Sequence, residues 1–167
     1  MTLFTTTDSP LGELLLVGEE STTTADGIAL ASLSLPGQKG GAQVQDGWRR
    51  DDQAFAGLAA RLGEYFAGGL TTFDLEVTGR GTDFQRRVWA ALDAIPYGTT
   101  TTYSRIAEQA GSPAAVRAVG AAIGANPLLV VRPCHRVIGA NGSLTGYAGG
   151  LPAKRHLLAL EGAIQAA

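Results

Sequence analysis

The sequence has only one cysteine, Cys134, and two histidines in 167 residues. A single cysteine cannot form an internal disulfide, which is typical of proteins kept in a reducing compartment. One cysteine and two histidines do not provide a structural zinc site with the usual ligand spacing, so we expect no metal. No apolar run approaches the roughly 18 residues that span a bilayer, and residues 1–10 lack the pattern of a signal peptide. We therefore expect a cytoplasmic protein with no membrane partner.

Charged residues are also scarce, at 17% against 45% hydrophobic residues, so the chain can bury a core and is not expected to be disordered. The net charge of −2 hides an asymmetry, because residues 1–80 sum to −6 and residues 81–167 sum to +4. A basic C-terminal half favours a polyanionic partner such as nucleic acid. Chance scatter over a solvated surface explains the same numbers equally simply.

The first half of the sequence has the pattern of a small sheet with one helix. Short strands are expected at residues 3–7, 13–17 and 27–35, with residues 8–12 closing a hairpin between the first two. Apolar residues at helical spacing predict a helix over residues 54–67, and residues 73–77 alternate like a strand. The charge balance changes at residues 78–81. We therefore expect an N-terminal domain of residues 1–78 and a C-terminal domain of residues 79–167.

The second half has the pattern of helices. Thr82 and Gln85 form a capping-box pattern ahead of an apolar stripe. A second helix is expected over residues 103–110. Ser112 and Pro113 resemble an N-cap and first helical residue, which predicts a third helix over residues 113–124. The short connection between the second and third helices makes them a helix-turn-helix candidate. A last helix is expected over residues 152–164.

The expected third helix consists mostly of alanine and glycine, and Arg117 is its only charged residue. Small side chains allow a helix backbone to approach another surface closely. One interpretation is close packing against a neighbouring helix. The other is a thin helix that enters a DNA groove with Arg117 at its tip. The spacing alone does not decide between them.

Cys134 and His135 are neighbours after an apolar run, which makes the cysteine a candidate nucleophile. A free thiol has a pKa of about 8.5, so a base or a positive charge is needed to raise its thiolate fraction at neutral pH. His135 is the candidate base, and Glu161 on the last helix is the best candidate to hold the imidazole tautomer. Alternatively, Cys134 is a small buried hydrophobe. Adjacent residues on a strand also point to opposite faces, so the two need not touch.

Motifs along most of the chain resemble the O6-alkylguanine-DNA alkyltransferase (methylguanine methyltransferase) family. The resemblance is weakest over residues 21–53, and the ordered set is more specific than any single motif. The matching segments are Asp8-Ser9-Pro10-Leu11-Gly12, Tyr65-Phe66-Ala67-Gly68, Gly81-Thr82-Asp83-Phe84-Gln85, Val88-Trp89, Ile95-Pro96-Tyr97-Gly98, Arg117-Ala118-Val119-Gly120, Asn126-Pro127, Pro133-Cys134-His135-Arg136-Val137, Gly146-Tyr147-Ala148-Gly149-Gly150 and Glu161-Gly162.

The resemblance implies both a fold and an activity. The fold would be α+β, with a small antiparallel-sheet-plus-helix N-terminal domain and a helical, winged-helix-like C-terminal domain. The activity would be DNA repair by irreversible, single-turnover transfer of an alkyl group from O6-alkylguanine to Cys134, with no cofactor. The implied partner is double-stranded DNA, entered from the minor groove with the damaged base flipped out of the stack. We expect the protein to act as a monomer.

The resemblance also implies residue roles. Cys134 would accept the alkyl group, His135 would act on it through a water, Glu161 would orient His135, and Asn126 would be a hinge between the recognition helix and the active-site strand. The DNA and base contacts would come from Tyr103, Arg117, Ala118, Val137, Tyr147 and Ala148. Arg117 would fill the space left by the flipped base, and Tyr103 would contact phosphate or base. Tyr147 would line the base pocket, the backbone of Cys134 and Val137 would accept from the guanine edge, and the amide of Ala148 would face O6.

The sequence departs from the family pattern at one of these positions, Ala148, and also at Arg132. Ala148 replaces a serine found in some relatives, which preserves a backbone role but not a hydroxyl role. Arg132 stands where an apolar residue is commoner, and the sequence leaves open whether it aids DNA binding or thiolate formation. Two other functions remain as alternatives: a lesion-binding helix-turn-helix protein with an inert Cys134, and a cysteine hydrolase with a Cys-His-Glu set. The hydrolase would leave Arg117 and its helix unexplained.

Overall fold

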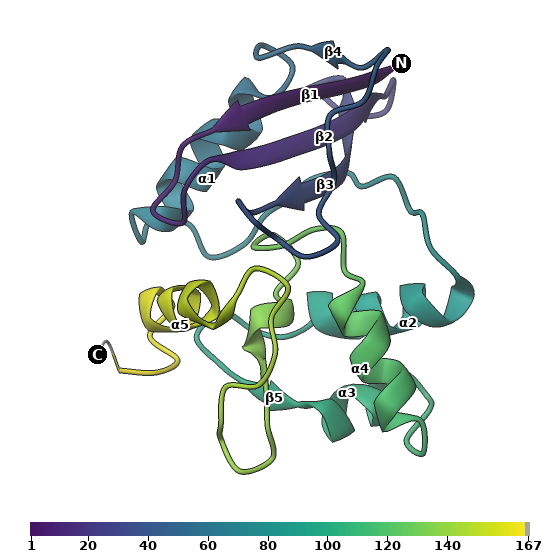
Figure 1. Cartoon of the computed structure of the whole chain (residues 1–167), viewed down its shortest axis with the longest axis vertical. Coiled ribbons are helices and arrows are strands. Elements are labelled where there is room, and N and C mark those ends of the chain that lie inside the picture. The colour runs from purple at the N-terminus through teal and green to yellow at the C-terminus, as the bar shows by residue number, and fades with distance from the viewer. Residues whose placement is uncertain (166–167) are drawn as a thin grey trace. The chain divides into compact units, whose positions relative to one another are not determined.

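The computed structural model describes residues 1–165 and divides the chain into two units, Met1–Gly79 and the residues from Arg80 onward. The first unit contains a four-stranded sheet in the order β3-β2-β1-β4 (Figure 1). Strand β1 (Thr2–Thr7) pairs antiparallel with β2 (Leu14–Glu20), and β2 pairs antiparallel with β3 (Ile28–Ser34). The two-residue strand β4 (Arg49–Arg50) extends the sheet in parallel with β1.

The predicted hairpin between the first two strands is confirmed. Thr7 pairs with Leu14 at its closed end, and the amide of Gly12 donates to the carbonyl of Ser9 at 2.9 Å. Gly12 has a φ of +99°, a conformation that side chains other than glycine rarely adopt. The turn therefore depends on a local sequence signal.

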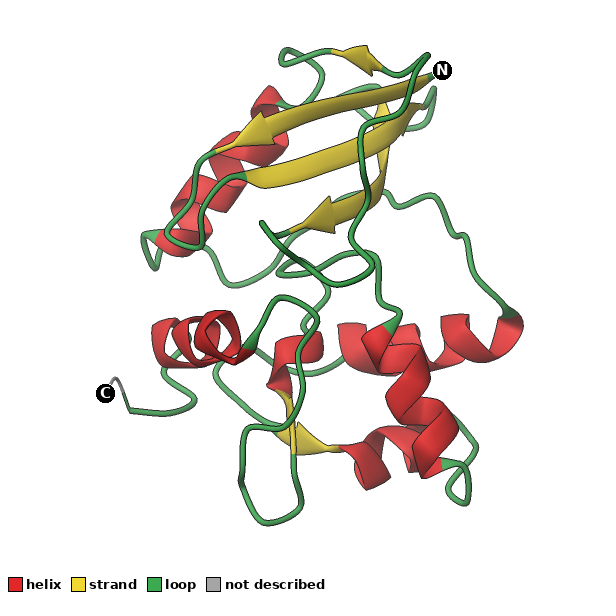
Figure 2. Ribbon diagram, viewed as in Figure 1, coloured by secondary structure: helices red, strands yellow, loops and turns green. Residues whose placement is uncertain are grey.

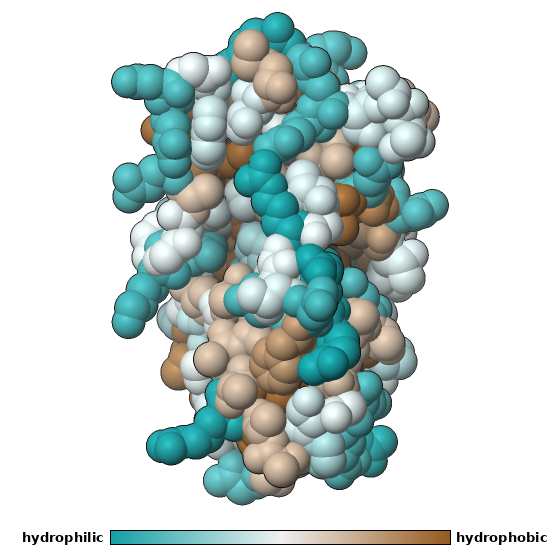
Figure 3. Space-filling view, turned by 90° about the vertical axis from the view of Figure 1, so that its right-hand side faces the viewer, coloured by the Kyte–Doolittle hydropathy of each residue, from teal (hydrophilic) through white to brown (hydrophobic). Residues whose placement is uncertain are grey.

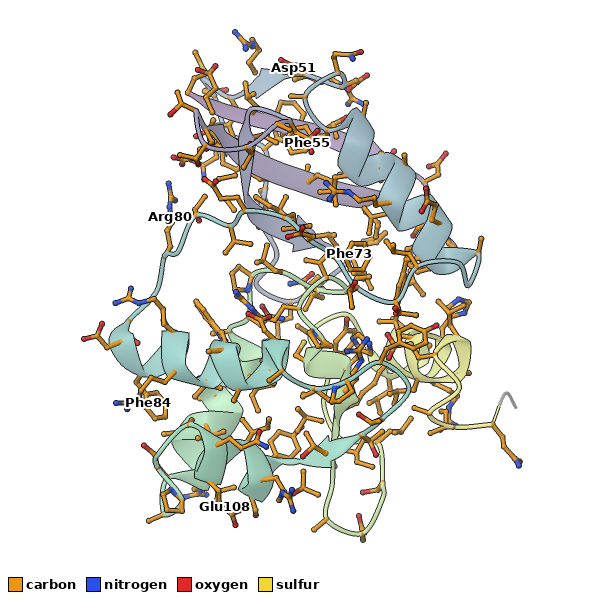
Figure 4. The ribbon with its side chains drawn as sticks, turned by 180° about the vertical axis from the view of Figure 1, so that it is seen from behind. Asp51, Phe55, Phe73, Arg80, Phe84 and Glu108 are labelled. Carbon is orange, nitrogen blue, oxygen red and sulfur yellow. The ribbon has the colours of Figure 1, made fainter. Side chains whose placement is uncertain are left out.

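Helix α1 (Ala56–Phe66) lies across one face of this sheet, as Figures 1 and 4 show. Alternate residues of β2 point toward the helix, and Leu14 and Leu16 are completely buried. From the helical side the core receives Leu62 and Tyr65, together with Phe55 just before the helix, which Figure 4 labels beside the sheet. The helical spacing of apolar residues in the sequence therefore identified the buried face of α1.

The strand expected over residues 73–77 is not formed, and this prediction was wrong. Val77 makes one isolated bridge with Leu30, in which Leu30 donates to the carbonyl of Glu76 and accepts from the amide of Thr78. Apolar alternation reports which side chains are buried, but a strand also needs a continuous row of backbone partners. This segment has those partners at a single residue.

The second unit is mainly helical, so the predicted α+β fold class is confirmed (Figure 2). Its elements are α2 (Asp83–Asp93), β5 (Thr101–Thr102), α3 (Tyr103–Gln109), α4 (Val116–Gly124), the 3₁₀ helix η1 (Cys134–Arg136), β6 (Val137–Ile138) and α5 (Leu151–Leu160). Strands β5 and β6 pair in parallel. The capping box is confirmed, because Thr82 and Gln85 each accept a hydrogen bond from the other's backbone amide.

Helix α4 begins three residues later than the Ser112-Pro113 pair predicts. Residues 112–115 instead form a turn, in which the amide of Ala115 donates to the carbonyl of Ser112 at 2.9 Å. The indole Nε1 of Trp89 on α2 donates to the carbonyl of Ala122 on α4 at 2.9 Å. This buried hydrogen bond fixes α4 against α2.

Candidate active site

Cys134 opens the 3₁₀ helix η1 and is 5% exposed. It lies at a pocket of about 200 Å³ within the second unit. The other lining residues come from α3, α4 and the loop after β6: Tyr103, Gly120, Ile123, Gly124, Gly146, Tyr147 and Ala148. The sequence-based expectation that Cys134 and His135 lie on a strand was wrong. In the tight turn of η1, the thiol faces a cavity and the next residue enters the core.

The approach to Cys134 includes a strained residue. Val130 has a φ of +69°, and it is the only described residue other than glycine with a positive φ. A β-branched residue in this conformation is a genuine outlier that costs roughly 1–2 kcal/mol. Val130 is nevertheless 2% exposed, so core packing holds it in place. Its conformation allows the chain to reverse so that Arg132 donates its amide to the carbonyl of Leu128.

Asn126 joins the end of α4 to this reversed segment. Its side-chain Oδ1 accepts from the amide of Leu128 at 3.0 Å, and its Nδ2 donates to the carbonyls of Leu128 and Arg132 at 3.3 and 3.4 Å. The same Arg132 carbonyl accepts from the amide of Cys134 at 2.7 Å. Asn126 is 2% exposed. This geometry agrees with the hinge role that the family resemblance implies.

His135, Arg136 and Glu161 form a buried cluster behind the thiol. His135 Nε2 lies 2.8 Å from Glu161 Oε2, and both side chains are fully buried. Arg136 donates to both carboxylate oxygens of Glu161, at 2.7 and 3.0 Å, and to the carbonyl of Ile95 at 2.6 Å. With Nε2 engaged by the carboxylate, His135 Nδ1 has no protein hydrogen-bond partner within residues 1–165. An imidazole held in this way can present a basic Nδ1 toward another group.

The sequence prediction did not include Arg136, although it stood inside the motif that carried the resemblance. Two nitrogens of its guanidinium donate to Glu161, the carboxylate that also contacts the imidazole of His135. The carboxylate therefore compensates Arg136 permanently and is available for an imidazolium when one forms.

Burial dominates the protonation of the two reacting groups. It raises the pKa of the Cys134 thiol to about 11, against smaller lowering effects of a hydrogen bond from Asn126 and of the charges of Lys154 and Arg132. Burial also lowers the pKa of His135, and Glu161 opposes this change. At neutral pH, in the absence of substrate, the thiol is protonated and the imidazole is neutral. The neutral imidazole is therefore free to accept the thiol proton, but both pKa shifts oppose that transfer in the absence of substrate.

Lys154 is a second residue that the sequence prediction missed. It is 1% exposed, and its Nζ donates to the carbonyls of Val137, Thr145 and Gly146 at 2.6, 2.7 and 3.3 Å. Its position in the sequence could have revealed it. Lys154 precedes the buried Leu157 by three residues, a spacing that places both on one helical face.

Arg132 lies against α2. Its guanidinium stacks 5.2 Å from the ring centre of Trp89, and its Nε donates to Asp93 at 3.1 Å. The side chain is only 9% exposed, so it is poorly placed for a phosphate contact. Its charge lowers the pKa of Cys134, but by less than the hydrogen bond from Asn126 or the charge of Lys154 does. Of the two roles that the sequence left open, the low exposure of Arg132 disfavours the one in DNA binding.

The remaining residues named from the sequence fall into two groups. Tyr103, Tyr147 and Ala148 line the pocket with Cys134. Val137 is fully buried and does not line the pocket, but its carbonyl keeps a second lone pair besides the one used by Lys154. The other group does not line the pocket.

Arg117 and Ala118 belong to this second group and lie on the exposed face of α4. The opposite face of this helix buries Val119, Ala122 and Ile123. Figure 3 views the side of the second unit that carries α2 and α4 and shows pale, weakly hydrophobic surface there. The exposed small residues therefore do not pack against a neighbouring helix of the described chain.

No cluster of histidine, cysteine or acidic side chains suited to hold a metal ion occurs within residues 1–165. The helices of the same region include none that is long and apolar enough to cross a bilayer.

Two family profiles match the chain. Residues 83–163 match the DNA-binding domain of 6-O-methylguanine DNA methyltransferase, and residues 2–78 match its ribonuclease-like domain. Methylated-DNA–protein-cysteine methyltransferase of Mycolicibacterium paratuberculosis is 52% identical over 95% of this chain and 91% of its own length. The protein of that name from Methanosarcina acetivorans is 46% identical over 93% of this chain and 95% of its own length.

Solved structures show the same similarity. The crystal structure of Mycobacterium tuberculosis OGT in complex with DNA is 49% identical, with a TM-score of 0.85 over 96% of this chain and 92% of that one. The O6-methylguanine-DNA methyltransferase of Pyrococcus kodakaraensis shares the fold at 22% identity, with a TM-score of 0.65 over 97% of this chain and 99% of that one.

Proposed function

Since the chain belongs to the 6-O-methylguanine DNA methyltransferase family, we propose that it repairs DNA by moving an alkyl group from O6 of guanine to the thiol of Cys134. The observation that carries the proposal is that Cys134 lines a base-sized pocket and directly precedes His135, which is hydrogen-bonded to Glu161. Sites for drug-sized ligands have volumes of roughly 300 Å³ or more. A pocket of about 200 Å³ therefore suits a single planar base.

The transfer requires a proton to leave sulfur and an alkyl group to arrive. His135 accepts the thiol proton, directly or through a water, and the imidazolium is stabilised by Glu161. The thiolate then attacks the alkyl carbon, forming a carbon–sulfur bond while the carbon–oxygen bond breaks and guanine keeps the electron pair. A hydroxyl donor at the pocket, Tyr103, helps the base to leave. The thioether is not hydrolysed by water, so one molecule repairs one lesion.

The substrate base reaches this pocket only if it leaves the duplex, because its O6 group is hidden in the stack. The exposed, small-residue face of α4 supports an approach to the minor groove, where Arg117 would enter the stack and Ala118 would face the DNA. In this arrangement Tyr147 lines one side of the base, and the amide of Ala148 and the carbonyls of Cys134 and Val137 bind its edge. Helices α3 and α4 would then act as the helix-turn-helix.

A cytoplasmic location is part of the proposal, because an acceptor thiol must stay reduced until it meets a lesion. A monomer suffices, since every group assigned a chemical role lies on one chain.

Intact-mass spectrometry tests the proposal. Incubation with duplex DNA containing O6-methylguanine should add one methyl group to the protein, on the peptide that carries Cys134. The variant Cys134→Ser should still bind this DNA and gain no mass. Repeated turnover would identify a hydrolase, and binding without any mass change would identify a lesion-binding protein with an inert cysteine.

A further inference from the structure

The loop between β6 and α5 supplies three of the pocket-lining residues, yet its internal hydrogen bonds are confined to its two ends. At one end the amide of Gly139 donates to the carbonyl of Ser143 at 2.9 Å. At the other end the amide of Gly150 donates to the backbone carbonyl of Tyr147 at 2.9 Å. Between these ends, Thr145 is held from outside the loop. Thr145 directly precedes the pocket-lining Gly146 and is contacted by two other elements.

The first of these contacts comes from α5. The ammonium of Lys154 donates to the carbonyl of Thr145 at 2.7 Å and to the carbonyl of Val137 in β6 at 2.6 Å. Lys154 is 1% exposed, so its flexible stem is fixed by packing and its charge by carbonyl oxygens. Charge-assisted hydrogen bonds of this kind are stronger than neutral ones. The backbone of Thr145 is therefore anchored to the strand that follows Cys134.

The second contact reaches α3. The hydroxyl of Thr145 donates to the phenol oxygen of Tyr103 at 3.2 Å. Tyr103 is the first residue of α3 and lines the pocket. Because the phenol oxygen accepts this bond, its own proton stays available to another acceptor. Thr145 is exposed, so a base that fills the pocket would exclude competing water and strengthen the bond.

We propose that Thr145 is a positioning residue for alkyl transfer: anchored by Lys154, its hydroxyl fixes the phenol of Tyr103 so that the phenol proton points toward the departing base. This inference rests on the proposed function, because it assigns a partner to the donor in that reaction. Thr145 itself touches no reacting atom.

A double-mutant cycle tests this role, with the rate constant of methyl transfer measured at saturating duplex DNA. Thr145→Val keeps the shape of the side chain and removes the hydroxyl. It should slow transfer about fivefold, the equivalent of one ordinary hydrogen bond. Thr145→Ser should restore the rate to within about twofold of the original protein. In a Tyr103→Phe background, Thr145→Val should have no further effect, because the two groups act as a unit.

Ser143→Ala is the matched control within the same loop. Ser143 is exposed, and its hydroxyl donates a hydrogen bond to the side-chain Oδ1 of Asn141 in the same loop at 2.7 Å. Removal of this hydroxyl should therefore leave the transfer rate unchanged. DNA affinity and far-ultraviolet circular dichroism are recorded for every variant. If Thr145→Val does not fold, Thr145→Ala takes its place in the cycle.

Two results would overturn the inference while leaving the proposed function intact. One is an unchanged rate for Thr145→Val. The other is an equal loss of transfer rate on Thr145→Val in the original protein and in the Tyr103→Phe background, which would mean that Thr145 acts only by supporting the fold of the loop. If the original protein transfers no methyl group, the proposed function is refuted as well. The original protein is therefore measured before any variant.

Discussion

His135 Nε2 lies 2.8 Å from Glu161 Oε2 in a site where neither side chain is exposed to solvent. Glu161 is the C-cap residue of α5, and it also receives both hydrogen bonds from Arg136. One carboxylate therefore orients the base and compensates a buried guanidinium. In the proposed reaction, stability and reactivity would both depend on this carboxylate.

Glu161→Gln should destabilise the protein by about 3–5 kcal/mol, because it leaves the buried charge of Arg136 without a counter-ion. It should also slow alkyl transfer, since the imidazolium loses its stabilising charge. Urea denaturation measures the first effect and the methyl-transfer rate constant the second. Asp93→Asn is the control, because the Asp93 side chain is 51% exposed and its pairing with Arg132 is expected to contribute less than about 1 kcal/mol. Equal losses from both substitutions would contradict the assignment of Glu161.

The pH dependence of transfer follows from His135. Burial lowers its pKa below the ordinary value of 6.5, despite the opposing effect of Glu161, so the imidazole remains a base at neutral pH. The rate constant should be flat across neutral pH and fall only below pH 6.5, by about tenfold per unit once the imidazole is protonated. His156→Gln, at the exposed second histidine, should leave this profile unchanged. A fall centred above pH 6.5 would be incompatible with His135 as the base.

The titration of His135 should also make the free energy of unfolding depend on pH, in a direction that its lowered pKa fixes. On acidification the unfolded chain protonates this histidine near pH 6.5, whereas the folded protein does so only at a lower pH. The unfolded state therefore binds more protons in that interval, and the free energy of unfolding falls as the pH drops below 6.5. Urea titrations of the original protein and of His135→Asn measure the difference. The variant should lack this part of the pH dependence.

Lys154→Met should destabilise the protein by about 1–3 kcal/mol, because it removes the charged donor from the buried carbonyl of Val137 and from the partly buried carbonyls of Thr145 and Gly146. Methionine retains most of the apolar stem, so the loss reports the ammonium group. Thermal or urea unfolding measures it, with Arg155→Met, at an exposed neighbour on the same helix, as control. A Lys154→Met protein as stable as the control would show that these three carbonyls are satisfied in another way.

Arg117→Ala should weaken repair of duplex DNA by at least about tenfold and leave transfer from free O6-benzylguanine nearly unchanged. An inserted side chain offsets part of the few kcal/mol that base extrusion costs, and a free base needs no extrusion. The two rate constants are compared in one preparation. Equal losses on both substrates would mean that Arg117 supports the fold or the pocket instead of filling the base stack.

Elements that depend on neighbours in the sequence were predicted well. The first hairpin is closed by a hydrogen bond between Gly12 and Ser9, and the start of α2 by the reciprocal bonds of Thr82 and Gln85. In each case the interacting groups are three residues apart. The errors arose where a local pattern lacked its distant partner, as over residues 73–77, or where Ser112 formed a turn and not a helix cap.

The sequence by itself determined that Cys134 is the only thiol in the chain, which makes it the candidate acceptor of the proposed transfer. It also determined the hairpin turn at Gly12 and the start of α2, because their hydrogen bonds join residues a few positions apart. Only the tertiary structure decided that Val130 is held in a left-handed conformation and that Glu161 meets a histidine 26 positions away. Such contacts form only when packing of the whole unit compensates for backbone strain, loop closure and desolvation of charge.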